Sequence, residues 1–307
     1  MGIFSRVMLV AAVCGLAVAG CGGRPAEPAG GRPVIVASIY PVASLTGMLY
    51  GDWAEIRTLL PAGQSPHDFD PTPAQQRMLA DADVLIVVGG GLDPWAESLA
   101  RQHPDIRLLR MIERVGLDPA TLPPHDESHH DHDHDHAHDH DHDHAADGDG
   151  SLPGVNPHVW LHPEMAFLFL EHLAVELGPM FPDHSLAARV HIAKKNVLNV
   201  AQLAKNDVAV LPNKRMVTFH NAFDRLAEHC GLEVVAHLTP IEHAPGGQVT
   251  PAQLKRVIDV VRRYDLAVLY TEPQMDPAAA RAIQAETGVE LLVLDPLGGP
   301  NVEGYSD

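Results

Sequence analysis

The chain has 307 residues and a formal net charge of −19 at neutral pH. Ten acidic residues and no basic ones fall within residues 125–150, so the rest of the chain carries only −9. This acidic balance gives no indication of the basic surface that nucleic-acid binding requires. Without the first 21 residues the chain is still longer than a usual single domain, which favours two lobes.

The first 21 residues have the composition of a secretory signal peptide. One early positive charge, Arg6, precedes an uncharged run from Val7 to Ala19 that is too short to cross a bilayer. The ending Val18-Ala19-Gly20-Cys21 is similar to a bacterial lipobox, in which the cysteine is lipidated; the alternative is a plain cleaved signal. We expect an exported protein anchored to a membrane through Cys21, with residues 22–32 as a flexible tether.

Cysteine usage agrees with this reading. Cys14 leaves with the signal peptide and Cys21 takes the lipid, so Cys230 is alone in the mature chain and no intramolecular disulfide can form. Cys230 lies on the apolar side of a helical stretch, which predicts a buried structural thiol.

Strand-like and helix-like segments alternate on both sides of the His-rich segment, which predicts two α/β lobes with mostly parallel sheets. The first lobe is expected over 33–184, with strands at 33–39, 54–60, 83–89 and 106–110 and helices at 41–50, 73–81 and 93–102. The second is expected over 209–307, with strands at 215–219, 232–238, 266–272 and 290–295 and helices at 221–230, 250–264 and 276–287. Between them, 185–208 contain a long stretch without Pro or Gly, which predicts one helix joining the lobes.

Residues that bind cations fall where the predicted strands end. Ligands of open α/β sheets bind beyond the carboxyl ends of the strands. His220, Glu272 and Asp295 each end or follow a predicted strand, and His67 lies in the loop after another. His158 lies in NPHVWLHP, between two prolines. Three imidazoles and a carboxylate form a suitable tetrahedral set for Zn²⁺.

Five motifs then give the chain a family resemblance. SPHDFDPTP, NPHVWLHP, VTFHNAFDRLAEHCGL, YTEPQ and LDPLG occur in this order, with a His/Asp-rich insert between the first two. This arrangement resembles the metal-binding lipoproteins of bacterial ABC uptake systems for zinc and manganese, and the ZnuA-type zinc branch most closely. The resemblance begins at residue 33. It also leads us to expect a closing helix after LDPLGGPNVEGYSD, so the second lobe is expected to be truncated here.

The resemblance implies two α/β lobes joined by a rigid helix, with the metal in the cleft between them. It implies His67 and His158 as ligands from the first lobe, and His220 and Asp295 as ligands from the second. Glu272 is the alternative fourth ligand or a hydrogen-bond acceptor for a ligand imidazole, and water is a third choice. Zn²⁺ is favoured over Mn²⁺, which prefers oxygen ligands. His162 is the rival of His158, although Pro157 and Pro163 disfavour a helix that would bring both rings to one face.

The implied function is capture of Zn²⁺ outside the inner membrane and delivery to a membrane permease, by a monomer and without enzymatic chemistry. Two other classes stay open. A zinc hydrolase would need an open water position and a general base such as Glu272. The other is a surface lipoprotein that buffers zinc through its His-rich segment or adheres to a host.

The His-rich segment itself lies in residues 125–150 and lacks the apolar residues that a packed core needs. We expect it to be disordered when metal-free. Ordering a chain around an ion costs conformational entropy, so its sites should be weaker than a preformed cleft. We predict an accessory zinc collector or sensor, whose imidazoles are those of His129, His130, His132, His134, His136, His138, His140, His142 and His144.

Overall fold

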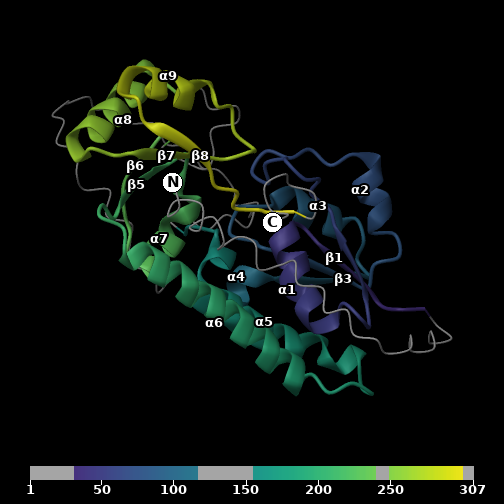
Figure 1. Cartoon of the computed structure of the whole chain (residues 1–307). Helices are drawn as coiled ribbons and strands as arrows, with labels where there is room; N and C mark the ends of the chain where they lie inside the picture. Colours follow the sequence, from purple (N-terminus) through teal and green to yellow (C-terminus); the bar gives the residue numbers. More distant parts are fainter. Residues whose placement is uncertain (1–30, 117–154, 240–248, 300–307) are drawn as a thin grey trace, which may run out of the picture.

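The computed structural model of the protein describes residues 31–116, 155–239 and 249–299. The expected signal peptide with Cys21, most of the tether and the His-rich insert lie outside these ranges. The described part forms two α/β lobes, as the sequence predicts (Figure 1). No helix within the described ranges is both long enough and apolar enough to span a membrane.

The first lobe contains a four-stranded parallel sheet in the order β2-β1-β3-β4. The central strands β1 (Val34–Ala37) and β3 (Val84–Val87) are VIVA and VLIV and are entirely buried, as expected where helices cover both faces of a parallel sheet. The edge strands β2 (Glu55–Thr58) and β4 (Arg107–Arg110) carry the charged residues. All four lie within the ranges that the sequence predicts.

The first-lobe helices are α1 (Tyr40–Tyr50), α2 (Pro73–Met78), α3 (Pro94–Arg101) and the short α4 (Met111–Arg114). The first three have a proline in the first turn, where its missing N–H removes no helical hydrogen bond. Thr72 also caps α2 through a capping box with Gln75. These starts agree with the prediction to within one residue.

Helix α5 (Pro163–Leu177) was missed by the sequence analysis. It follows the short 3₁₀ turn η3 (Val159–Leu161) and ends at the turn η4 (Gly178–Met180). Its buried residues Ala166, Phe169, Leu170, Leu173 and Leu177 recur at helical spacing and join the first core. The helical spacing was therefore present in the sequence, but it lies within an almost continuous apolar run.

Helix α6 (Ala187–Ala209) joins the lobes, as predicted, and runs along the base of the molecule beside α5 (Figure 1). Its 23 residues span about 35 Å at 1.5 Å per residue. It packs on α1 and α5 of the first lobe and on α7 of the second. The side chains it buries are small, namely Ala193, Ala201, Ala204 and Val208, whereas the larger Leu203 is exposed.

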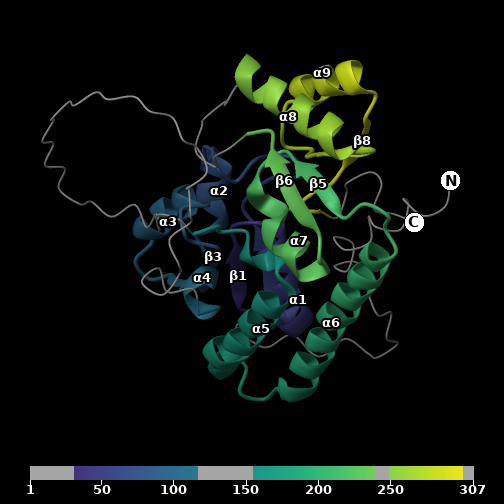
Figure 2. The ribbon, with the colours of Figure 1, turned by 90° about the vertical axis from the view of Figure 1, so that its left-hand side faces the viewer.

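The second lobe has two parallel strand pairs (Figure 2). β5 (Arg215–Thr218) pairs with β6 (Glu233–His237), β7 (Val268–Thr271) pairs with β8 (Glu290–Val293), and β5 lies beside β7. The turn η5 (Asn221–Phe223) leads into α7 (Asp224–Cys230), and α8 (Pro251–Tyr264) and α9 (Ala278–Thr287) complete the lobe. Cys230 is buried against α6, which agrees with the predicted structural thiol.

The end of the described chain returns from the second lobe to the first. After β8, Leu297 is buried in the core of the first lobe. In the same segment the backbone oxygen of Pro296 accepts a hydrogen bond from Trp160 Nε1 at 2.8 Å. The lobes are therefore held together by α6 and also by this crossing segment, which borders the candidate site.

Candidate metal site

His220 begins the second-lobe side of the site. It follows the buried end of β5 and has only 4% of its surface exposed. The hydroxyl of Thr218 donates to the backbone oxygen of His220 at 2.8 Å, which fixes the backbone at the strand end. Glu272 follows β7, the strand beside β5, so the two side chains emerge at the same sheet edge.

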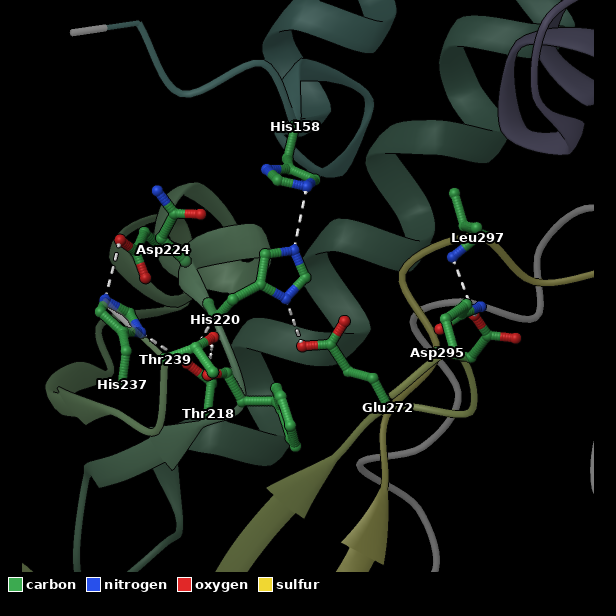
Figure 3. Close-up of polar contacts among 12 residues, drawn as sticks. His158, Thr218, His220, Asp224, His237, Thr239, Glu272, Asp295 and Leu297 are labelled. Carbon is green, nitrogen blue, oxygen red and sulfur yellow. Dashed lines mark hydrogen bonds and ion pairs between the residues drawn. The ribbon is translucent and has the colours of Figure 1, made fainter. Parts of the chain in front are cut away.

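His220 Nδ1 and Glu272 Oε1 are 2.7 Å apart (Figure 3). A carboxylate can only accept, so the imidazole proton lies on Nδ1 and the lone pair on Nε2. Both side chains are almost fully buried, which strengthens this interaction. The other carboxylate oxygen, Oε2, is buried and makes no hydrogen bond within the described residues.

His158 forms the facing side, from the segment just before η3. Asn156 Oδ1 accepts from its backbone N–H at 3.0 Å and contacts its ring Nδ1 at 2.9 Å. The amide nitrogen of Asn156 donates to the backbone oxygen of Asn221 at 2.8 Å. These backbone partners fix the amide orientation, so Oδ1 accepts from Nδ1–H and the lone pair of His158 lies on Nε2.

His158 is kept neutral by its surroundings. Burial lowers its pKa well below the usual value, and the nearby His220, His67 and Arg225 lower this pKa further. A neutral imidazole is the form that binds a metal ion. The side chain is 2% exposed, so the ring cannot turn to water without movement of its neighbours.

His67 supplies the third ring, from the loop after β2. Its backbone N–H donates to Ser65 Oγ at 3.2 Å, and Trp95 Nε1 donates to the backbone oxygen of Pro66 at 2.8 Å. The first bond stabilises the loop itself, and the second ties it to α3. One ring nitrogen each of His67, His158 and His220 lie within 4.8 Å of one another, and the ring centroids are 5.0–5.6 Å apart.

The three rings line one pocket between the lobes. The first lobe contributes His67, His158 and Trp160, and the second contributes His220, Glu272 and Gln274. The structure therefore brings together the three histidines that the sequence singled out.

Asp295, the predicted fourth ligand, does not belong to this three-histidine group. It is 1% exposed, and its Oδ1 accepts from Gln274 Nε2 at 2.8 Å and from the Leu297 N–H at 2.9 Å (Figure 3). Glu272, Gln274 and Leu297 line the pocket, whereas Asp295 is not among the residues that line it.

His162, the rival of His158, is also outside the group. It begins α5, and its ring faces His229 of α7 with centroids 5.7 Å apart. The short 3₁₀ turn η3 lies between the two histidines, in place of the continuous helix that would bring both rings to one face. Sequence reasoning missed Asn156 and Arg225; the only signal was that Asn156 stands two residues before a candidate ligand.

Two α/β lobes, one joining helix and a buried pocket between the lobes define a two-lobed binding protein. The family model described as zinc-uptake complex component A periplasmic, ZnuA, matches residues 35–307, and the chain belongs to this family.

Relatives with curated names agree with this membership. The zinc-binding lipoprotein AdcA of Streptococcus pneumoniae serotype 4 is 29% identical over 294 residues, covering 94% of this chain and 54% of its own length. The high-affinity zinc uptake system protein ZnuA of Bacillus subtilis is 27% identical over 315 residues, covering 98% and 92%. The manganese-binding lipoprotein MntA of Halalkalibacterium halodurans is 23% identical, covering 99% and 93%. The chain thus spans about half the length of the AdcA relatives.

Solved structures share the fold. A crystal structure of ZnuA has a TM-score of 0.71 at 24% identity and covers 87% of this chain and 92% of its own. A zinc-bound ZnuA deletion mutant has a TM-score of 0.70 at 22% identity, with coverage of 90% and 93%. These likenesses confirm the two-lobed α/β architecture predicted from the sequence.

Proposed function

We propose that this protein captures Zn²⁺ outside the cytoplasm, at His67, His158 and His220, and delivers it to an ABC permease. One observation carries the proposal. The Nε2 atoms of His158 and His220 face each other at 3.2 Å, and the partners of both rings place the protons on the Nδ1 atoms. Two lone pairs at this distance repel each other, and a cation between them removes the repulsion.

The spacing also fits zinc. With Zn–N bonds of about 2.0–2.1 Å and a tetrahedral angle, two ligand nitrogens lie roughly 3.3 Å apart. The observed separation of 3.2 Å agrees closely. Imidazole is a better ligand for Zn²⁺ than for Mn²⁺, and the ZnuA and AdcA relatives are named for zinc, so we favour zinc over the manganese of MntA.

The fourth coordination position is predicted to take Asp295. Three neutral imidazoles and one carboxylate around Zn²⁺ leave a net charge of +1, compared with +2 when water is the fourth ligand, so the carboxylate lowers the cost of burying the ion. Reaching the ion requires Asp295 to leave Gln274 and the Leu297 N–H. Glu272 instead supports His220 from the far side of the ring, because its carboxylate contacts Nδ1 and not Nε2.

The same contact is an argument against hydrolysis. A zinc hydrolase needs a general base that reaches the metal-bound water. Glu272 Oε1 is already engaged with His220 Nδ1, on the side of the ring opposite the proposed ion. Capture and release of the ion require no such base.

The proposed cellular location is based on the amino-terminal sequence around Cys21. We propose that Cys21 carries a lipid that holds the protein at the outer face of a membrane, in agreement with relatives named as lipoproteins. The permease partner is implied by the zinc-uptake family. Residues 33–184 and 209–307 are proposed as the two lobes, with 185–208 as the joining segment.

Zinc titration tests the proposal directly. In the mature chain lacking residues 125–150, isothermal calorimetry should show one tight site, and competition with Mn²⁺ should leave zinc bound. A variant with alanine at His67, His158 and His220 should lose that site. As a matched control, alanine at the exposed His191, His172 and His184 should keep it. Tight binding by the first variant would overturn the proposal.

A further inference from the structure

We propose that Asn156 is a positioning residue through which contact between the lobes controls the zinc affinity of His158. The inference rests on the proposed zinc site and assigns a new role to a residue that does not touch the ion. Asn156 belongs to the first lobe, is 7% exposed, and stands two residues before His158. Its side chain and its backbone each bond to the second lobe.

The side chain performs two tasks at once. Its oxygen holds the backbone N–H and ring Nδ1 of His158, and its nitrogen donates to the backbone oxygen of Asn221, the neighbour of His220. The Asn221 oxygen can accept a hydrogen bond from the amide nitrogen but not from the amide oxygen, so together with the His158 backbone N–H it keeps the amide oxygen turned towards His158. The second lobe thereby helps to fix which nitrogen of a first-lobe histidine carries the lone pair.

Arg225 of α7 adds a second connection. Its Nε and Nη2 donate to the backbone oxygen of Asn156 at 3.3 and 3.1 Å. This pair of bonds holds the segment before His158 against the second lobe through the backbone of Asn156, whereas Asn221 is bonded by the side chain. Mutations can therefore test separately the bonds that hold the lobes together and the amide contact that determines the tautomer of His158.

The functional consequence concerns release of the ion. When the second lobe moves away from Asn156, the amide keeps the His158 backbone N–H but loses the Asn221 oxygen, so the His158 tautomer is held less firmly. The lone pair then faces the ion for only part of the time, which weakens binding. Lobe separation at the permease would release zinc through this step, even though α6 keeps the lobes joined.

Three variants separate these roles. Asn156→Ala removes both contacts and should weaken zinc binding roughly 10- to 100-fold, the range for loss of a partner that orients a ligand. Asn156→Asp keeps an oxygen acceptor for His158 but opposes the Asn221 oxygen, so it should retain the His158 tautomer and release zinc faster. Arg225→Lys keeps the charge but loses the paired geometry, and should also speed release.

The matched control is Asn213→Ala. Asn213 has the same pattern far from the site, since Oδ1 accepts the N–H of Arg215 and Nδ2 donates to the backbone oxygen of Tyr264. This variant should bind and release zinc like the parent chain. It measures the effect of losing an asparagine side chain with these two hydrogen bonds at a position outside the site.

The measurements are zinc affinity by chelator competition, zinc release by stopped-flow with excess chelator, and long-range ¹H–¹⁵N spectra that show which imidazole nitrogen is protonated. Asn156→Ala should give mixed tautomers at His158, and Asn156→Asp should restore one. Parent affinity and an unchanged tautomer in Asn156→Ala would overturn the inference. His158→Ala is the reference: if it also binds zinc normally, the proposed zinc site fails instead.

Discussion

The two sides of the pocket hold their histidines in different ways. On the first-lobe side, His158 is oriented by a neutral amide, Asn156, which is itself held by the His158 backbone N–H and by the opposite lobe. On the second-lobe side, His220 is oriented by a buried carboxylate, Glu272, from the neighbouring strand of the same lobe. The second side is thus complete within its lobe, whereas the first becomes complete when the lobes meet.

The two sides of the pocket also differ in the charge that lies behind their histidines. Glu272 places negative charge behind His220, while Asn156 and the nearby Arg225 place none behind His158. The charge that offsets a bound cation therefore comes from the second lobe. Mutations on the two sides should consequently differ in their effect on the free protein, even where their effects on zinc are similar.

The largest effect is expected from removing a ligand. His67→Ala, His158→Ala and His220→Ala should each weaken tight zinc binding by more than about 10-fold, because each removes a proposed direct ligand. His162→Ala should have little effect, since that ring faces His229. Calorimetry on the four variants checks the order, and a larger loss in His162→Ala would refute the assignment.

The same variants should differ in stability without metal. His220→Ala leaves the buried Glu272 carboxylate without its hydrogen bond, whereas His158→Ala leaves a neutral amide that still bonds to the second lobe. We expect His220→Ala to lower the free energy of unfolding by about 1–3 kcal/mol more than His158→Ala. Urea denaturation of both apo variants measures this; equal losses would mean that the two sides are equivalent.

Moving the carboxylate from one side of the pocket to the other tests whether charge explains the difference between them. Glu272→Gln keeps an acceptor for His220 Nδ1–H but removes the charge, and should weaken zinc binding roughly 10- to 100-fold. Adding Asn156→Asp returns one carboxylate, now behind His158. Chelator competition should show partial recovery of affinity in the double variant, because the added negative charge speeds capture of the cation by more than the lost Asn221 bond speeds its release. If the double variant binds no better than Glu272→Gln, charge is not what the second lobe contributes.

Much of the candidate site can be predicted from the sequence, because several of its residues directly follow the ends of predicted strands. His220 and Glu272 come directly after apolar runs that form adjacent parallel strands, and parallel strands bring their carboxyl ends to one edge. The helix starts were equally accessible, because proline marks the first turn of α2, α3 and α8. These are local signals, and local signals determine most of each lobe.

The remaining features depend on how the lobes meet. The hydrogen bond between Asn156 and Asn221 joins residues 65 positions apart, and no periodicity or local motif indicates it. Asp295 shows the same limit: its position at the end of a strand predicts a ligand, but the sequence does not indicate the hydrogen bonds that its carboxylate accepts from Gln274 and the Leu297 N–H. Helix α5 was missed for a different reason, since its apolar run lacks a clear polar face.

The pH dependence of stability tests the neutral side of the pocket. Burial lowers the pKa of His158 in the folded chain well below the usual value, so the unfolded chain binds this proton more readily. The stability contribution of His158 is therefore present above pH about 6.5 and is lost as the pH falls towards the lowered pKa. Asp93 acts oppositely, because burial raises its pKa to about 6.

Comparing the parent chain with a His158 variant isolates the contribution of this histidine to the pH dependence of stability. Urea denaturation of the apo parent and of His158→Gln, at pH 7.5 and pH 5, should show that the parent loses more stability than the variant on acidification. Asp93 contributes equally to both and cancels. A parent and a variant with parallel pH profiles would mean that His158 is not held neutral by burial.

A smaller effect is expected from Asp295→Ala. As the predicted fourth ligand it contributes charge, but water can take its place, so zinc binding should weaken by less than about 10-fold, below the loss for any of the three histidines. Chelator competition measures the change. An affinity equal to that of the parent would leave the fourth position to water or Glu272.

The smallest effect on the tight site is expected from deleting residues 125–150, which lie between His67 and His158 in the sequence and so belong to the first-lobe side. The nine histidines between His129 and His144 alternate mostly with Asp, and wrapping this segment around an ion costs about 1–2 kcal/mol per residue fixed. The described histidines already converge without it, from elements held by hydrogen bonds within and between the lobes. Calorimetry of the deletion variant should therefore show loss of several weak sites and one tight site of nearly unchanged affinity. If the tight site disappears, the segment itself supplies a ligand, and the first side of the pocket has more than two.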